Sequence, residues 1–347
     1  TVAKVAKNSV ITIDVIADLN EISDNATITP TLKMSYTGVT SNTRATKEAT
    51  GDEVKISQVS VASPVVVAGN MPSQYIVGGS DYQLGSYKFV ATNGSPKITE
   101  AVFEIGGNVA QSISFAGGNA TVVGTTATLT GLNYVIPQGT TGVNIPVVVK
   151  YAPVSTTGGV ASGATTTVTL KSFKYDGGNG VVSTSSASYP ALNEMTLVAS
   201  KPVIAVSNYT GGLAGGNQKL VEFTVKPETA SIKLDEVKFN VSVSSSNATT
   251  SAYKLYVGGS ELSGVTIATT SGVVTATLPA NYEFATQQTF ALYATVSGAL
   301  GTAGSSSITT SLDATGFKWT DTAGGATSPE NGSLINGFPT NSWTLRN

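Results

Sequence analysis

The chain contains neither cysteine nor histidine among its 347 residues. Without cysteine it has no disulfides, no thiolate nucleophiles and no cysteine-bound metals. Without histidine it has no Ser-His-Asp triad, no histidine-bound zinc or iron, and none of the side chains that most often act as general base at neutral pH. These absences remove most routes to catalysis, so we expect a protein that is not an enzyme.

Charge is also scarce. Only 12% of the residues are charged and the formal net charge is −2, whereas about 25% is usual for soluble domains. The few basic residues are scattered, which excludes a nucleic-acid partner. A surface of Ser, Thr, Gly and Asn carries little like-charge repulsion, and its packing against copies of itself immobilises few long side chains, so it costs little conformational entropy. This composition favours self-assembly, although a monomer kept soluble by hydroxyl groups or glycans fits it too.

Long apolar runs and helical patterns are missing. The longest apolar runs are strand-sized, such as residues 143–149, and a membrane helix needs about 20 apolar residues. β-Branched residues dominate, and Gly or Pro interrupts them about every ten residues. We therefore predict an all-β chain that does not insert into a membrane.

An internal repeat is present instead. Three segments share a strand pair around a hydroxyl-rich loop, and only the last two follow a front half; Pro64 and Pro202 mark a period of 202 − 64 = 138 residues. The pattern predicts an all-β array of tandem β-sandwiches in a rod. The shared segments are residues 10–38, 143–177 and 289–321. The predicted units are an incomplete half-sandwich at 1–61 and complete sandwiches at 62–198 and 199–347.

A half-sandwich cannot close its own core. Its missing half either precedes it in a longer polypeptide or comes from a neighbouring copy by strand addition. Alternating apolar residues of the half-unit, together with a C-terminal tryptophan, are the candidate subunit contacts. They are Val2, Val5, Val10, Ile11, Ile13, Val15 and Trp343. The tryptophan has a second interpretation, since it also suits the core of the last sandwich.

Glycine pairs and prolines mark the turns and junctions. Gly106-Gly107 and Gly258-Gly259 occupy what the repeat indicates are equivalent places, and Gly-Gly suits two-residue hairpins of type I′ or II′. Pro64 stands where the half-unit meets the first full unit, and Pro202 where the two full units meet. Because proline fixes φ, we expect stiff junctions.

Oxygen-rich clusters give the metal and catalytic candidates. A loop with four such side chains suits calcium, which takes six to eight oxygen ligands, although turns stabilised by their own side chains explain it as well. The candidates are Asp18, Asn20, Glu21 and Asp24, with a weaker cluster at Asp313, Asp321 and Glu330. No other cofactor is expected. The carboxylate pairs Asp14 with Asp18 and Asp235 with Glu236 lack an aromatic platform, so we interpret them as solvated rather than as a glycosidase pair.

The last unit, with KPVIAVSN and KLVEFTVKPETASIKLDEVKFNV, and the unit before it, with SYKFVATNGSPKITEAVF and LNYVIPQGTTGVNIPVVVKYAP, resemble modules of secreted β-sandwich surface proteins of uncultivated bacteria. More loosely, the chain is similar to S-layer and surface-filament subunits built from tandem immunoglobulin-like domains, which implies that its β-sandwiches are immunoglobulin-like. The resemblance implies an extracellular, cell-surface scaffold whose partners are copies of itself. The alternative is an adhesin or fibre that recognises glycans, a cell-wall polymer or a host surface.

Overall fold

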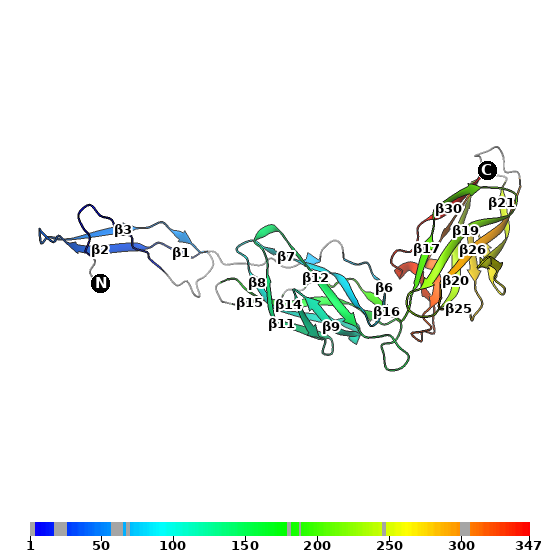
Figure 1. Ribbon diagram of the computed structural model, residues 1–347, viewed down its shortest axis with the longest axis horizontal. Helices are drawn as coiled ribbons and strands as arrows, with labels where there is room; N and C mark the ends of the chain where they lie inside the picture. The colour runs from blue at the N-terminus through cyan, green and yellow to red at the C-terminus, as the bar shows by residue number, and fades with distance from the viewer. Residues whose placement is uncertain are drawn as a thin grey trace.

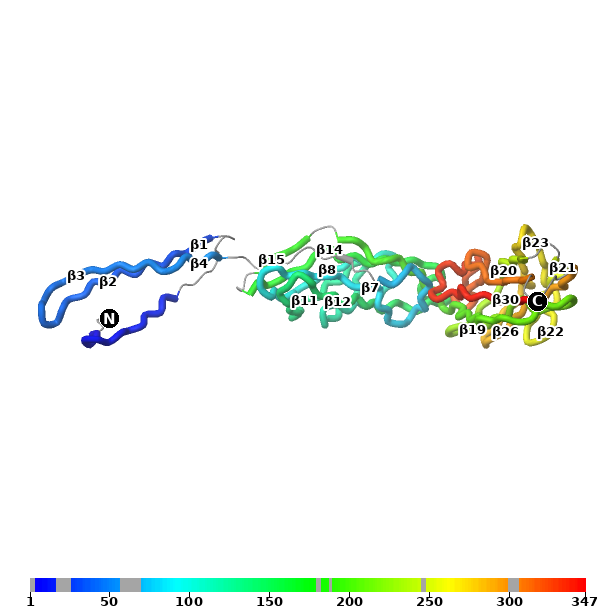
Figure 2. Tube along the Cα trace, turned by 90° about the horizontal axis from the view of Figure 1, so that it is seen from above, coloured from blue at the N-terminus to red at the C-terminus, as the bar shows by residue number. Residues whose placement is uncertain are grey.

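The computed structural model describes residues 4–16, 26–56, 65–66, 70–178, 182–186, 189–244, 248–298 and 306–347. Within these residues the chain is built from strands, with three short 3₁₀ turns as the only helical elements. Figure 1 shows a hairpin and two sandwiches following one another in a row, and Figure 2 shows the same elongated arrangement from above. The prediction of an all-β chain with tandem sandwiches is confirmed. No helix among the described residues is long and apolar enough to cross a membrane.

The N-terminal part is a long hairpin. β2 (Thr31–Thr37) pairs antiparallel with β3 (Arg44–Thr50), and β1 (Thr27–Ile28) pairs with β4 (Val54–Lys55) at the open end. These strands form two-stranded sheets only. A two-stranded hairpin on its own is marginally stable in water, so further strands or a packed surface are needed to stabilise it.

The central unit has two sheets that face each other. The five-stranded sheet has the order β10-β9-β12-β7-β5, and the four-stranded sheet has the order β11-β8-β14-β15. In chain order the strands are β5 (Val65–Val66), β7 (Asp81–Ala91), β8 (Lys97–Ile105), β9 (Ala110–Phe115), β10 (Gly118–Thr121), β11 (Thr126–Val135), β12 (Gly139–Tyr151), β14 (Val168–Asp176) and β15 (Val182–Ser185).

The C-terminal unit repeats this plan. Its first sheet has the order β17-β19-β26-β21-β22, and its second the order β18-β30-β27-β20-β24-β23, with β25, β28 and β29 attached. The strands are β17 (Pro202–Val206), β18 (Tyr209–Gly212), β19 (Gly216–Pro227), β20 (Ile232–Val243), β21 (Thr249–Val257), β22 (Ser260–Glu261), β23 (Thr266–Thr270), β24 (Val273–Thr277), β25 (Glu283–Phe284), β26 (Gln288–Ser297), β27 (Ser307–Leu312), β28 (Lys318–Thr320), β29 (Glu330–Asn331) and β30 (Ser342–Arg346).

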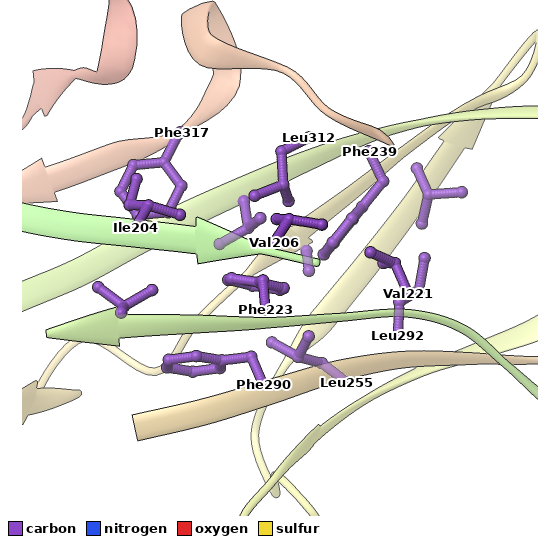
Figure 3. Packing of buried hydrophobic residues seen from close by; sticks show 14 of the residues in the cluster. Ile204, Val206, Val221, Phe223, Phe239, Leu255, Phe290, Leu292, Leu312 and Phe317 are labelled. Carbon is purple, nitrogen blue, oxygen red and sulfur yellow. The ribbon is translucent and has the colours of Figure 1, made fainter. Parts of the chain in front are cut away.

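Aromatic side chains from both sheets fill the C-terminal core (Figure 3). Phe223 of β19 stacks on Phe290 of β26 with ring centroids 5.2 Å apart, and it meets Phe239 of the facing sheet at 5.9 Å. Each of these rings is at most 1% exposed. Period-two alternation places them on the inner face of each strand, as the sequence pattern indicates.

The two glycine pairs turn out to have different roles. Gly258-Gly259 joins β21 to β22 as a two-residue hairpin with φ of 56° and 87°, as predicted. Gly106-Gly107 does not form a hairpin, because β8 and β9 belong to different sheets. There the chain turns a corner through the 3₁₀ turn η1 (Gly106–Asn108). The hairpin that matches Gly258-Gly259 in the central unit is Ala116-Gly117, between β9 and β10.

A small third sheet closes the central unit where it meets the C-terminal one. β16 (Met195–Val198) pairs parallel with β6 (Gln74–Val77) and antiparallel with β13 (Thr165–Thr166). β17 starts at Pro202, so only residues 199–201 separate the strands of one unit from those of the next. Pro202, where a stiff junction is expected, is thus the first residue of β17.

Candidate functional site

The hairpin β2–β3 has one apolar and one polar face. Side chains directly opposite each other in the ladder share a face. On one face Leu32 lies opposite Ala49, and Tyr36 lies opposite Ala45, with Met34 and Lys47 between these pairs. The other face carries only hydroxyl and charged side chains. These are Thr31, Lys33, Ser35 and Thr37 of β2 and Arg44, Thr46, Glu48 and Thr50 of β3.

The apolar face lies open. Met34 is 41% and Tyr36 is 51% exposed, and no residue among 26–56 is buried. The repeat aligns TPTLK of β2 with TVTLK of β14, so Leu32 is the counterpart of Leu170, which is fully buried in the central unit. The apolar face of the hairpin therefore corresponds in sequence to an inner face of the central sandwich, and the described residues of this chain do not cover it.

The predicted contact residues near the N-terminus are also exposed. Val5, Val10, Ile11, Ile13 and Val15 are between 47% and 92% exposed, and residues 4–16 form no strand. Figure 2 shows this segment following the hairpin along part of its length. Val2 lies outside the described residues. The N-terminal part thus presents apolar side chains to solvent over two separate segments.

Trp343 lies in a different environment. Its side chain is 5% exposed in β30, its ring centroid is 4.2 Å from that of Tyr209, and the Lys219 ammonium sits 5.5 Å from the ring. β30 pairs with β27 inside the second sheet, and Trp343 belongs to the cluster of buried residues that forms the C-terminal core. The structure therefore corrects the proposed surface contact at Trp343 and supports its core interpretation.

Only some of the metal and catalytic candidates fall within the described residues. Asp18, Asn20, Glu21 and Asp24 lie outside the described residues, and elsewhere no group of three or more acidic side chains is placed to hold a metal ion. Each carboxylate of the pair Asp235 and Glu236 has its own lysine. Asp235 is 2.8 Å from Lys233, and Glu236 is 2.9 Å from Lys318. Asp14 is exposed, and its suggested partner Asp18 is not described.

The junction between the two sandwiches contains a buried carboxylate. Asp321 is fully buried. Its Oδ2 accepts hydrogen bonds from the Ser162 hydroxyl at 2.6 Å and the Ala199 N–H at 2.7 Å. Its Oδ1 accepts from the N–H groups of Ser200 and Gly324, both at 3.2 Å. Because Ser162 belongs to the central unit and residues 199–200 to the linker, one side chain of the C-terminal unit fastens all three parts.

The junction between the two sandwiches also contains an aromatic contact and an ion pair. The Tyr75 ring of β6 meets Trp319 of β28 edge to face at 5.3 Å, and its hydroxyl donates to Glu330 at 2.9 Å. Lys201 donates to the Tyr75 carbonyl at 2.8 Å and pairs with Glu228 at 3.6 Å. Burial, with the Glu330 carboxylate as the next cause, raises the pKa of Tyr75 well above its ordinary value. Tyr75 packs into the C-terminal core, so the junction is a continuous packed interface.

The sequence placed this junction near Pro202 but did not indicate which residues make its contacts. Asp321 and Glu330 stood out only as a weak oxygen cluster, and Tyr75 did not stand out at all. Tyr75 and Glu330 are 255 positions apart, and Ser162 and Asp321 are 159 apart. Only Pro202 marked the place, through its restricted backbone.

Comparisons with known proteins give distant likenesses only. No family model and no curated protein sequence matches the chain. A putative membrane-anchored protein from Corynebacterium diphtheriae is similar over 93% of this chain and 97% of its own, at 9% identity and a TM-score of 0.24. The major pilin subunit BcpA of Bacillus cereus is similar over 79% of this chain and 68% of its own, at 10% identity and a TM-score of 0.25. The N-terminal domain of the Streptococcus gordonii adhesin Sgo0707 is similar over 76% of this chain and 60% of its own, at 12% identity and a TM-score of 0.25. Scores this low carry no argument about function.

Proposed function

We propose that the protein is a non-catalytic structural subunit, secreted and held at the cell surface, that assembles with copies of itself into a layer, sheath or filament. The observation that carries the proposal is the uncovered apolar face of β2–β3. Leu32, Met34 and Tyr36 form a strip on this face, and Leu170, the counterpart of Leu32 in the central unit, is fully buried. An exposed apolar strip of this kind in a chain otherwise rich in hydroxyl groups marks a contact with another protein surface.

The low charge supports the same function. With 12% charged residues, subunits meet with little repulsion and few long side chains to immobilise. In this proposal the two sandwiches and the N-terminal hairpin have different roles in the assembly. The two sandwiches supply rigid length, because Asp321 and Tyr75 join them through buried contacts, and the N-terminal hairpin supplies the contact by completing its fold with a neighbour.

The test is a comparison of self-association in matched variants. Met34→Asp and Ser35→Asp introduce the same charge at adjacent, exposed positions on opposite faces of β2. Sedimentation velocity of the whole chain over a range of concentrations, with and without calcium, is expected to show assembly of wild type and Ser35→Asp. Met34→Asp is expected to remain monomeric, because a carboxylate in a covered apolar face costs several kcal/mol to desolvate.

Wild-type protein that stays monomeric at all concentrations would sink the proposal. Equal assembly of the two variants would also contradict it, because the apolar face would then make no difference. Electron microscopy of the assembled wild type distinguishes a layer from a filament.

A further inference from the structure

The outer edge of β2 has no strand beside it. β2 pairs with β3 on one side, and in the part of the chain that the structure describes its other side is unpaired. In the central unit the counterpart strand β14 has a neighbour on each side, β15 and β8. The position that β8 fills beside β14 is therefore open beside β2. An open strand edge is a template for pairing with another chain.

We propose that this edge pairs antiparallel with β2 of a second copy, about a two-fold axis at Met34. The inference rests on the proposed self-assembly and names its contact. Two hairpins joined in this way form one four-stranded sheet in the order β3-β2-β2-β3. A two-fold contact of identical edges is isologous, which is the commonest arrangement in homo-oligomers.

The side chains of β2 fit this register. With Met34 at the axis, Leu32 lies opposite Tyr36 of the second copy on the apolar face, and this aliphatic-aromatic pair is favourable. On the polar face Lys33 lies opposite Ser35 of the second copy, so no like charges meet. All seven residues of β2 find a partner, because Thr31 falls opposite Thr37.

Other registers and the other edge fit worse. Moving the axis one position to Lys33 places two lysines directly opposite each other, which is destabilising. Moving it to Ser35 leaves part of the strand unpaired. At the outer edge of β3 the central residue is Lys47, so symmetrical pairing there again opposes two lysines. Charge therefore selects Met34 over Lys33 as the axis in β2 and disfavours the central register at β3.

Pairing also makes the apolar strips continuous. Leu32, Met34 and Tyr36 of one copy come to lie beside the same residues of the other. The layer that covers β14 in the central unit contains β12, and the repeat makes residues 10–16 the counterpart of β12. Each copy thus brings one extra segment for the second layer, residues 10–16, whose exposed apolar side chains include Ile11, Ile13 and Val15.

The absence of cysteine from the chain makes the register directly testable. Met34→Cys places two thiols opposite each other at the axis, where Cβ atoms are about 4.5–5.5 Å apart, within easy adjustment of disulfide geometry. Oxidation of the whole-chain variant is expected to give a covalent dimer on non-reducing gels. A mixture of Leu32→Cys and Tyr36→Cys chains is expected to give a mixed dimer, whereas each alone gives little.

Lys47→Cys is the matched control on the same face of the same hairpin. In the four-stranded sheet its two copies are three strand spacings apart, about 14 Å. Thiols whose Cα atoms are more than about 7 Å apart cannot be joined, so we expect at least about ten-fold less dimer than from Met34→Cys.

The outcomes separate the two proposals. Sedimentation of the same variants under reducing conditions reports assembly independently of the disulfide. Assembly without a Met34→Cys dimer, or with equal dimer from Lys47→Cys, overturns the β2 edge and leaves the assembly proposal standing. Absence of both assembly and disulfide overturns both. The register is supported if Met34→Cys gives a covalent dimer, Leu32→Cys with Tyr36→Cys gives the mixed dimer, and Lys47→Cys gives little dimer.

Discussion

Replacing Asp321 with alanine tests the junction most directly. The substitution removes an acceptor of four hydrogen bonds and leaves the N–H groups of Ala199, Ser200 and Gly324 and the Ser162 hydroxyl without it. Hydrogen bonds to a charged group contribute about 1.5–3 kcal/mol each. We assign about 1.5 kcal/mol to each of the two short hydrogen bonds, at 2.6 and 2.7 Å, and less to each of the two at 3.2 Å. Removing the carboxylate also regains part of its desolvation cost, so the net loss is about 3–5 kcal/mol.

The assay is urea unfolding followed by tryptophan fluorescence. Both tryptophans, Trp319 and Trp343, are buried in the C-terminal unit, and Trp319 touches Tyr75 across the junction, so the emission reports unfolding of this unit together with the loss of that contact. With a denaturant slope of about 2 kcal/mol per M, the midpoint of the C-terminal transition is expected to fall by about 1.5–2.5 M. Asp81→Ala, at an exposed carboxylate, is the control and should leave the midpoint in place. A midpoint for Asp321→Ala equal to that of the control would refute the reasoning.

Three further predictions concern single side chains. Tyr75→Phe should cost about 1–2 kcal/mol at neutral pH through the lost bond to a carboxylate. The pKa of Tyr75 is raised on folding, so the contribution of its protonated hydroxyl to wild-type stability is lost as the pH rises above about 10. In urea unfolding above that pH, the free energy of unfolding of Tyr75→Phe should therefore fall less steeply than that of wild type, by up to about 1.4 kcal/mol per pH unit. Gly259→Ala, at a φ of 87°, should lower the thermal midpoint by the equivalent of about 1 kcal/mol, whereas Gly212→Ala, in open space, should not; equal shifts would contradict the turn assignment. Asp313→Ala removes the cap of the 3₁₀ turn η2 (Ala314–Gly316) and should cost about 0.5–1 kcal/mol. The Thr315 hydroxyl lowers the pKa of Asp313, so this difference should vanish in urea titrations at acid pH, and a difference that persists there would exclude the charged cap.

The sequence was sufficient for the sandwiches because alternation assigns each strand residue to a face. Phe223, Phe239 and Phe290 lie inward as their period indicates. The same pattern could not decide whether Trp343 faces a core or a partner, because both environments favour an apolar side chain at that position. The burial of Trp343 among the residues of the C-terminal core resolves this.

Turns and junctions were less accessible. Two identical Gly-Gly pairs serve different backbone tasks, one in a hairpin and the other in a corner between sheets. Local sequence does not say which strand comes next to which. The Asp321 cluster was hidden for a similar reason, because three of its four hydrogen-bond donors are between 121 and 159 positions away. Contacts at such separations leave no periodic trace.

The short linker between the sandwiches has a mechanical consequence. Residues 199–201 are all that connect β16 to β17, and three residues span at most about 10 Å when fully extended. The Ala199 and Ser200 N–H groups are bonded to Asp321, and the Ser200 hydroxyl donates to the Ala230 carbonyl at 2.7 Å. Under tension along the chain, this linker can therefore extend very little. A stretched molecule keeps its length until the hydrogen bonds around Asp321 break or one of the sandwiches unfolds.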